Sequence, residues 1–424
     1  MMSQTGSAGV WRVATRVVGG RNAVDRIGPE CRALGSAPLL VTDDAVGRLP
    51  VADLVRRELA LHGVSRAAEV RVPPSPALAD VSAAVVQAAQ VAPDCVVALG
   101  GGSVIDAAKV IALCLTNASV PDRVAGWPHG LLDLDDEPLR PGLPVLAVPT
   151  TAATGSEVNG VAALLVDGDR LLLTSGWLVP RTALVDPDLT ATLPARDLIA
   201  GGLETLLRVL CPYVADSDQR AGRVVDGVAE GLMEAMCEVL DRLAADPGDA
   251  AARAELSRAA TLTGAQVDRV GRDPWAHGLW YLQNPLCHRL GTSKGMTMAA
   301  LLPTYLSDIA GGGPWGSRFG SPQRLARTPL GRGSAGARDV AEATRERLAR
   351  WGLPSALPAG VAGPVMDAAA AEAHRRWSTA GPLAGAAVAN ITDFYRRCAG
   401  EHADAALELP AVPPVMDPMT LGRR

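Results

Sequence analysis

Lysine is scarce in this 424-residue sequence, because only Lys109 and Lys294 of its 40 basic residues are lysines. Aromatic residues make up 3% of the chain. No apolar run reaches the roughly 18 residues of a transmembrane helix, and the N-terminus has no apolar core of signal-peptide length. Seven scattered cysteines form no CxxC pair, so we expect reduced thiols in a cytoplasmic protein.

The charge balance also excludes classes of partner. The net charge is -5 and the isoelectric point is near 5.8. Neither value favours binding to nucleic acid or to an anionic membrane surface. The composition is 48% apolar, and the length suits two domains of ordinary size. We therefore expect a globular protein with no nucleic-acid partner and no membrane partner.

The first half of the chain alternates apolar runs with helix-period stretches. The runs predict strands at 38–46, 68–73, 94–103 and 142–151, and the stretches between them predict helices at 49–64, 76–92 and 103–116. Continuous apolar strands separated by helices are typical of a parallel sheet with both faces covered. Residues 10–193 are therefore expected to form an α/β domain.

The pattern changes after Leu193. Residues 194–405 show helical periodicity and no convincing strand, which predicts an all-helical second domain. The segment 311–337 is rich in Gly, Pro and Arg, and we expect it to be a mobile loop. Residues 1–9 and 406–424 are expected to be flexible.

A glycine-rich turn follows the strand that is predicted near residue 95. Gly100, Gly101, Gly102 and Ser103 lie between this strand and the next helix. Glycine lets the backbone approach a ligand closely, and the amides at a helix N-terminus favour an anion such as a diphosphate. A tight strand-to-helix turn would also use glycine. We expect Lys109 and Asp106, on the same helix, to brace this turn.

Two further elements strengthen the prediction of a nucleotide site. The stretch VPTTAATGSEV follows another predicted strand and supplies Thr150, Thr151, Thr154 and Ser156. Asp43 follows the strand at 38–46, where a carboxylate can accept a hydrogen bond from a ribose hydroxyl. Taken separately, the hydroxyls could cap turns and Asp43 could cap a helix. Polar loops at the ends of several parallel strands indicate a nucleotide.

These motifs resemble those of iron-containing (group III) alcohol dehydrogenases, with glycerol dehydrogenase and dehydroquinate synthase as more distant relatives. LLVTDD, VALGGGSVIDAAKVIAL, VPTTAATGSEV, ALVDPDLTATLP and KGMTMAALLP occur in the family's order and at about its spacing, between residues 10 and 400. The resemblance implies a Rossmann-like NAD(P)-binding domain and an all-α C-terminal domain, the dehydroquinate synthase-like fold. Nicotinamide and substrate would occupy a cleft between the two domains.

The resemblance also assigns roles to the cofactor residues. It implies that Asp43 contacts the adenosine ribose, that Gly101, Gly102 and Ser103 contact the diphosphate, that Thr150, Thr151 and Thr154 flank the cofactor, and that Arg170 replaces a lysine near the ribose. A carboxylate at Asp43 would repel a 2′-phosphate. The expected cofactor is therefore NAD.

The sequence departs from the family at the metal site. The family holds a divalent metal with an Asp and a His one helical turn apart and two further His. Glu204, Arg208, Trp280 and Lys294 stand at these four places. Arginine keeps its proton in proteins and does not bind metals. We therefore expect no metal in this chain.

Lys294 is the candidate replacement for the metal. Lysine is a compact cation that gives up its proton readily when it is buried, so Lys294 could polarise a substrate oxygen and accept its proton. Glu204 and Arg208 are spaced to pair on one helix face and are further catalytic candidates. Two plainer alternatives remain open: a structural Glu204–Arg208 pair, and a Lys294–Glu204 salt bridge without chemistry.

Replacement metal ligands are a weaker alternative. His277, His288 and Cys287 lie near this region in sequence and could join Glu204 in an irregular set. Core or surface positions are the plainer interpretation of both histidines. Trp280 is much larger than the ligand it replaces, so the pocket must be reshaped.

The leading functional hypothesis is a metal-independent, NAD-dependent dehydrogenase of a secondary alcohol or its ketone. Arg208 and Lys294 would suit a carboxylate-bearing 3-hydroxy acid, or a peptide with a C-terminal threonine in a biosynthetic tailoring pathway of a high-GC bacterium. The alternatives are an NAD-binding pseudoenzyme subunit and a metal-dependent alcohol dehydrogenase with unusual ligands. A homodimer or a partner enzyme of the pathway is expected.

Overall fold

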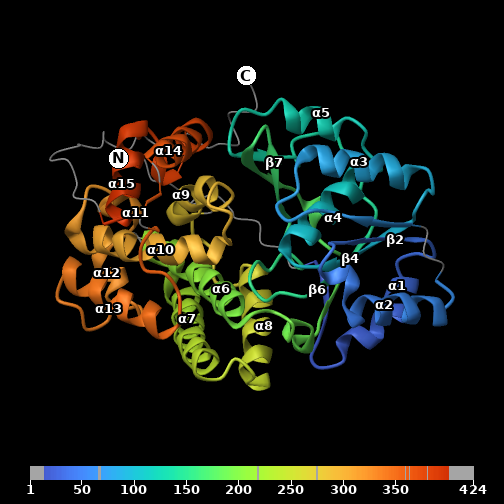
Figure 1. Cartoon of the computed structure of the whole chain (residues 1–424), viewed down its shortest axis with the longest axis horizontal. Helices are drawn as coiled ribbons and strands as arrows, with labels where there is room; N and C mark the ends of the chain where they lie inside the picture. The colour runs from blue at the N-terminus through green and yellow to red at the C-terminus, as the bar shows by residue number, and fades with distance from the viewer. Residues whose placement is uncertain are drawn as a thin grey trace.

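The computed structural model describes residues 14–64, 68–216, 219–273, 276–358, 360–361, 363–379 and 381–400. The segments 1–9 and 406–424, for which we expect flexibility, lie outside these residues. Figure 1 shows an α/β half on the right and a helical half on the left. The change from strands to helices falls between Val185 and Ala195.

A six-stranded parallel sheet forms the centre of the α/β half, as predicted. Its strands, in spatial order, are β1 (Arg16–Gly19), β9 (Thr182–Val185), β6 (Val145–Pro149), β4 (Cys95–Gly100), β2 (Pro38–Thr42) and β3 (Ala68–Arg71). The chain moves outward from β2 to β3 and then crosses to the other side of β2 to form β4. The order therefore reverses between β2 and β4, which is where open α/β sheets bind ligands.

Helices cover both faces of this sheet. Because successive strand residues point to opposite faces, Leu39 and Val41 belong to one core while Leu40 belongs to another. The first core packs against α3 (Leu78–Ala89) and α4 (Gly102–Cys114), and the second against α1 (Ile27–Arg32) and α2 (Pro50–Leu61). Burial on both faces explains why the strands read as uninterrupted apolar runs.

A second, three-stranded sheet was not predicted. It contains β5 (Leu131–Asp133), β8 (Asp169–Thr174) and β7 (Val161–Val166), in that order. β7 and β8 form an antiparallel hairpin whose turn residues, Asp167 and Gly168, both have positive φ (52° and 81°). An Asp-Gly turn between apolar runs is a strong hairpin signal, so this element could have been found from the sequence.

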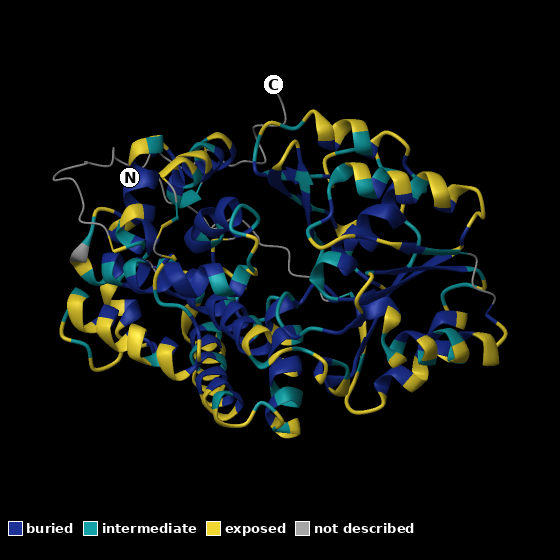
Figure 2. Ribbon diagram, viewed as in Figure 1, coloured by how far each residue is buried: buried dark blue, intermediate teal, exposed yellow. Residues whose placement is uncertain are grey.

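The helical half surrounds one apolar helix, α6 (Ala195–Ala215). By length and composition α6 could span a membrane, but 83% of its apolar window is buried inside the protein, so it is a core helix (Figure 2). It packs against α7 (Gly222–Ala245), α8 (Ala250–Gly264) and α10 (Lys294–Ser307). The other long helices of this half are α9 (Gly278–Cys287), α13 (Ala337–Arg350), α14 (Gly363–Trp377) and α15 (Val388–Cys398). Among the described residues after Val185 there is no strand, as predicted.

The segment 311–337 is packed against the core, so the prediction of a mobile loop is wrong. It contains two short helices, α11 (Gly316–Phe319) and α12 (Pro322–Leu325). Trp315, Phe319 and Arg324 are buried, and the Trp315 and Phe319 rings stack. The buried side chains fix a segment whose Gly and Pro content is typical of loops.

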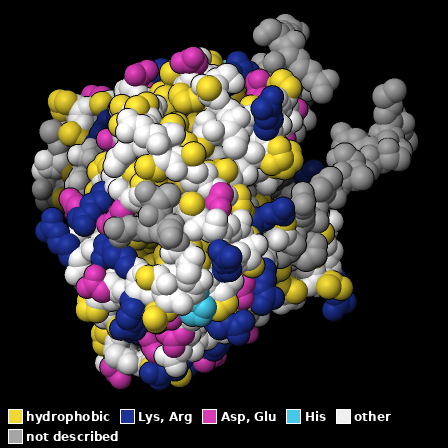
Figure 3. Space-filling view, turned by 90° about the vertical axis from the view of Figure 1, so that its right-hand side faces the viewer, with side chains coloured by type: hydrophobic (Ala, Val, Ile, Leu, Met, Phe, Trp, Pro, Cys, Tyr) yellow, Lys and Arg dark blue, Asp and Glu magenta, His cyan; other side chains and the backbone are white. Residues whose placement is uncertain are grey.

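The surface of the α/β half carries charges of both signs. On the face seen in Figure 3, basic and acidic side chains of the described residues are interspersed, and no broad area of one sign is visible there.

Candidate functional site

The two polar loops of the α/β half touch each other. Gly101 is the N-cap of α4, and a Cβ at Gly102 would lie 2.6 Å from Cγ2 of Thr154. A Cβ at Gly101 would lie 3.1 Å from Cγ2 of Thr151. The backbone N–H of Thr150 donates to the carbonyl of Gly100 at 3.0 Å. Glycine is therefore required at the turn, because any side chain would push the two loops apart.

Lys109, on α4, holds the hydroxyl-rich loop in place by hydrogen bonds. Its Nζ donates to Oγ of Ser156 at 2.7 Å, to Oδ1 of Asn159 at 3.2 Å and to the carbonyl of Val161 at 3.0 Å. Oγ of Ser156 in turn donates to Asp106, whose Oδ2 accepts from the N–H of Ala163 at 3.0 Å. Burial lowers the pKa of Lys109 to about 8. Lys109 and Asp106 thus brace the hydroxyl-rich loop and the residues after it, whereas the sequence predicted that they brace the glycine-rich turn.

Asp43 lies at the point where the strand order reverses. Its Oδ1 accepts from the N–H of Val46 at 2.7 Å, so it caps the following turn, as in the plainer interpretation. Oδ2 has no hydrogen-bond partner among the described residues. The ribose contact remains a prediction that this free oxygen allows. Ser103, in the first turn of α4, follows the neighbouring strand at the same edge.

Arg170 lies on β8, in the second sheet, and is buried. Its Nη2 donates to Oγ of Ser75 at 3.0 Å, and its backbone N–H donates to Oε1 of Glu372 at 3.0 Å. Nε has no hydrogen-bond partner in the described structure. The expected contact between Arg170 and a cofactor ribose stays a prediction.

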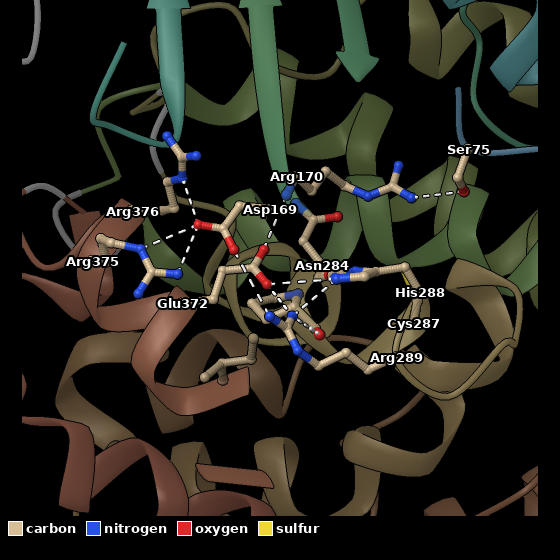
Figure 4. Close-up of polar contacts among 12 residues, drawn as sticks. Ser75, Asp169, Arg170, Asn284, Cys287, His288, Arg289, Glu372, Arg375 and Arg376 are labelled. Carbon is tan, nitrogen blue, oxygen red and sulfur yellow. Dashed lines mark hydrogen bonds and ion pairs between the residues drawn. The ribbon is translucent and has the colours of Figure 1, made fainter. Parts of the chain in front are cut away.

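Arg170 belongs to a network that joins the two halves of the protein. Asp169 and Glu372 lie at its centre, and Figure 4 shows arginines from α14 and from the end of α9 converging on them. Arg376 Nε lies 3.2 Å from Asp169, and Arg289 pairs with Glu372. The ion pairs attach α9 and α14 to β8.

The halves also meet where two glycines touch. Gly155, in the hydroxyl-rich loop, has φ 61°, and Gly264 is the last residue of α8. A Cβ on Gly155 would lie 2.5 Å from Cα of Gly264. Only glycine suits both the positive φ of residue 155 and the close contact between the two backbones.

Glu204 and Arg208 form the predicted pair on α6. Nη2 of Arg208 donates to Oε1 of Glu204 at 3.0 Å, with the two side chains 12% and 6% exposed. The same Nη2 donates to the carbonyl of Ala153 at 3.2 Å. The pair therefore connects the helix that carries two of the former metal positions with the hydroxyl-rich loop.

Lys294 is the first residue of α10, where Ser293 caps the helix. It is half-buried, and its ammonium makes no hydrogen bond or ion pair with any described residue. The Lys294–Glu204 salt bridge that we considered is therefore not formed. Gly295 touches the backbone of Ala200, so the start of α10 packs directly on α6.

The residues at the former metal positions do not fit a metal ion. Arg208 is engaged with Glu204, and Arg208 also lies over the ring of Trp280, with 5.9 Å between guanidinium carbon and ring centroid. Among the described residues, no group of three or more His, Cys, Asp or Glu side chains could hold a metal. The alternative set of His277, His288, Cys287 and Glu204 is therefore not assembled.

A first prediction concerns metal content. Protein purified from medium supplemented with iron or zinc is expected to contain no stoichiometric metal, because cationic and apolar side chains replace the ligands. Elemental analysis of the purified chain measures this directly. About one metal ion per chain, lost in the variant Glu204→Ala, would contradict the prediction.

Asp268 and Arg269, beside this site, were not identified from the sequence, and His277 was identified only as an alternative metal ligand. Arg269 Nη2 lies 3.5 Å from the carbonyl of Arg208, and Asp268 is fully buried. The ring of His277 lies 5.4 Å from that of Trp280. Asp268 and Arg269 fall in a stretch after α8 that has helical periodicity and no recognisable motif, so only the tertiary packing assigns them to the site.

Comparisons with known proteins agree with this architecture. The family model described as iron-containing alcohol dehydrogenase matches residues 14–187. The chain is 31% identical over 294 residues to the probable alcohol dehydrogenase EutG of Salmonella typhimurium, covering 68% of this chain and 70% of the relative. It is 31% identical over 350 residues to a 4-hydroxybutyrate dehydrogenase of Cupriavidus necator, covering 79% and 85%.

A solved structure extends the similarity to the whole fold. The NADH-dependent butanol dehydrogenase A of Thermotoga maritima superimposes with a TM-score of 0.80 at 23% identity, covering 92% of this chain and 98% of that one. Both halves and their arrangement are therefore shared. Together with the sequence relatives, this shows that the chain is an alcohol dehydrogenase-like oxidoreductase that belongs to the iron-containing alcohol dehydrogenase family.

Proposed function

We propose that the protein is an NAD-dependent dehydrogenase that oxidises a secondary alcohol without a metal, with Lys294 in the place of the metal. The observation that carries the proposal is the contrast between two sets of residues. The cofactor loops are complete and braced by Lys109. At the metal positions, Lys294 is a cation with no partner among the described residues.

Oxidation of an alcohol requires a positive charge to stabilise the substrate oxygen and a group that accepts its proton. NAD⁺, when bound, supplies the hydride acceptor. Lys294 in its neutral form takes the proton of the hydroxyl group, while the electron pair of the carbinol C–H bond leaves with its hydrogen as hydride. The products are a ketone, NADH and the Lys294 ammonium, which then returns its proton to solvent. In the reverse direction the ammonium polarises the ketone oxygen and donates the proton.

The proposed substrate is a 3-hydroxy acid, either a small molecule or a peptide that ends in threonine. Arg208 offers a guanidinium beside the site, which suits a carboxylate. The similarity to a relative named 4-hydroxybutyrate dehydrogenase supports a carboxylate-bearing substrate. Oxidation of a 3-hydroxy acid gives a 3-keto acid, which can release carbon dioxide and leave a ketone.

The direct test is the formation of NADH, followed by absorbance, with a panel of secondary alcohols, 3-hydroxy acids and threonine-terminated peptides. Each assay is run with and without a metal chelator. We expect turnover of a carboxylate-bearing member that the chelator leaves unchanged. Activity that appears only after iron or zinc is added would contradict the metal-independent mechanism.

A second prediction concerns cofactor choice. NAD(H) is expected to bind more tightly than NADP(H), because the Asp43 carboxylate accepts from the 2′-hydroxyl and repels a 2′-phosphate. Asp43→Ser should weaken NAD⁺ binding roughly tenfold and reduce the discrimination against NADP⁺, as loss of a charged hydrogen bond implies. Fluorescence titration with NADH and NADPH measures both effects. Equal affinity of the unmodified protein for the two cofactors would disprove the assignment.

A second candidate function is an NAD-binding subunit that assists a partner enzyme without turnover. It is favoured by the same observation, that Glu204, Arg208, Trp280 and Lys294 stand at the positions of the family's metal ligands. The two proposals differ in one result. The subunit binds NAD⁺ but forms no NADH with any member of the panel. A homodimer, or a complex with another enzyme of the pathway, is proposed in either case.

A further inference from the structure

Buried polar atoms without partners gather beside the Glu204–Arg208 pair. In the described structure, Nε of Arg208, Nε of Arg269 and both ring nitrogens of His277 are buried and make no hydrogen bond. Leaving such groups unpaired is costly, so native folds pair nearly all of them with protein, water or ligand. Four nitrogens at one site indicate that something absent from the chain itself satisfies them.

Two of these side chains, Arg208 and His277, lie against the ring of Trp280, and Arg269 contacts the backbone of Arg208. The Arg208 guanidinium carbon lies 5.9 Å from the centroid of this ring, and the His277 ring lies 5.4 Å from it. Arg269 donates from its Nη2 to the carbonyl of Arg208 at 3.5 Å. Because Trp280 stands where the family has a metal ligand, the cluster lies at the position of the lost metal.

The charges in this cluster favour an anion. Burial, and then the positive charges of Arg269 and Arg208, lower the pKa of His277 well below its usual value, so its ring is neutral and donates one N–H. Burial is also the largest cause that lowers the pKa of Arg269, to about 10. Two acidic side chains adjoin the cluster. Glu204 pairs with Nη2 of Arg208 at 3.0 Å and leaves Nε of Arg208 unpaired. Burial raises the pKa of the unpartnered Asp268 carboxyl group, which weakens it as a counter-charge.

A carboxylate matches these donors. It carries one negative charge and accepts several hydrogen bonds, and guanidinium groups bind it in bidentate geometry. The neutral His277 ring adds a donor without adding charge. A metal cation would be repelled by both arginines, and an uncharged alcohol would leave most of the donors unpaired.

We propose that Arg208, Arg269 and His277 form a subsite that binds the carboxylate of the substrate and selects hydroxy acids over unsubstituted alcohols. The inference rests on the proposed function, because it assigns the carboxylate of that substrate to named residues. The start of α10 touches α6 at Ala200, two helical turns (about 12 Å) from Arg208. For one short molecule to reach both groups, the long side chains of Lys294 and Arg208 must extend toward each other across this separation.

Binding measured by calorimetry in the presence of NAD⁺ tests the subsite without requiring turnover. The probes are N-acetylthreonine and its uncharged amide, N-acetylthreoninamide. We expect the acid to bind roughly 10- to 100-fold more tightly than the amide, as charged hydrogen bonds imply. Arg269→Gln should remove this preference by weakening the binding of the acid and not that of the amide. Arg258→Gln, an exposed arginine on α8, is the matched control and should change neither affinity.

A second variant distinguishes loss of the subsite from misfolding. Arg269→Lys keeps the charge but loses the bidentate geometry, so it should reduce the affinity for the acid by a smaller factor. Thermal melting of each variant checks that the fold survives. The inference is wrong if neither variant weakens binding of the acid, or if acid and amide bind equally. It is also wrong if the unmodified protein binds no acid. In each case the cluster holds ordered water only.

The proposed function can fail separately. Loss of acid binding in Arg269→Gln, combined with no NADH from the unmodified protein on any substrate, would support the carboxylate subsite and reject the dehydrogenase. Turnover that does not depend on Arg269 or on a substrate carboxylate would support the dehydrogenase and reject the carboxylate subsite.

Discussion

Lys294→Met is expected to lower turnover by roughly 10²- to 10³-fold, the loss seen when one preorganised oxyanion donor is removed. Methionine keeps most of the length and apolar volume of lysine but carries no charge and cannot accept a proton. Because Lys294 has no partner among the described residues, its removal breaks no ion pair in the fold. Stability and NAD⁺ affinity should therefore stay close to those of the unmodified protein.

Two further variants sharpen this test. Lys294→Arg should not restore activity, because a guanidinium group cannot take the proton of the alcohol. Arg345→Met removes an exposed cation from α13 and should leave turnover unchanged. Steady-state kinetics, thermal melting and NADH titration are measured on all three. If Lys294→Met turns over the substrate at the unmodified rate, Lys294 does not replace the metal. If only the melting temperature falls, its role is structural.

Asp226→Ala is expected to destabilise the protein by about 3–5 kcal/mol, because buried Arg324 loses its bidentate partner and buried Arg272 keeps only Asp216, at 2.8 Å. Arg324 donates to both carboxylate oxygens of Asp226, at 2.6 and 2.7 Å, and Arg272 donates to Oδ1 at 2.7 Å. Both arginine side chains are at most 3% exposed. Arg324 also lies over the ring of Tyr213, 3.9 Å from its centroid, so the pairs attach the 311–337 segment to α6 and α7.

An exposed ion pair on the same helix serves as the control. Glu234 and Arg332 are 51% and 62% exposed, so Glu234→Ala should change the free energy of unfolding by less than about 1 kcal/mol. Chemical denaturation of both variants measures the difference. Similar destabilisation by the two substitutions would contradict the central role assigned to the Asp226 pairs.

The same pairs make stability depend on pH. The hydrogen bonds from Arg324, the largest favourable cause, lower the pKa of Asp226 to about 2. Since the pKa of an unfolded aspartate is about 3.9, the native state binds this proton less readily. The contribution of the pairs is therefore complete above about pH 4 and is lost as the pH falls toward 2. Asp226→Ala should lack this component of acid sensitivity.

The sequence by itself was sufficient for the fold of the cofactor half. Strands with two buried faces are continuous apolar runs, and glycines before a helix mark a close approach, so both signals are local. The motifs containing Gly101 and Thr154 also identified the family, and the relatives confirm it. Glu204 and Arg208 were predictable as a pair because they lie one turn apart on a single helix.

Tertiary structure decided everything that depends on residues distant in sequence. Asp226 and Arg324 are 98 positions apart, so composition alone made the 311–337 segment look like a loop. A Lys294–Glu204 salt bridge was one alternative that the sequence left open, but Arg208 occupies that carboxylate and Lys294 is left without a described partner. The sequence placed His277 near the site but not Arg269, and it did not bring the two together, because unpaired donors become visible only when packing shows which atoms are buried and which partners are missing.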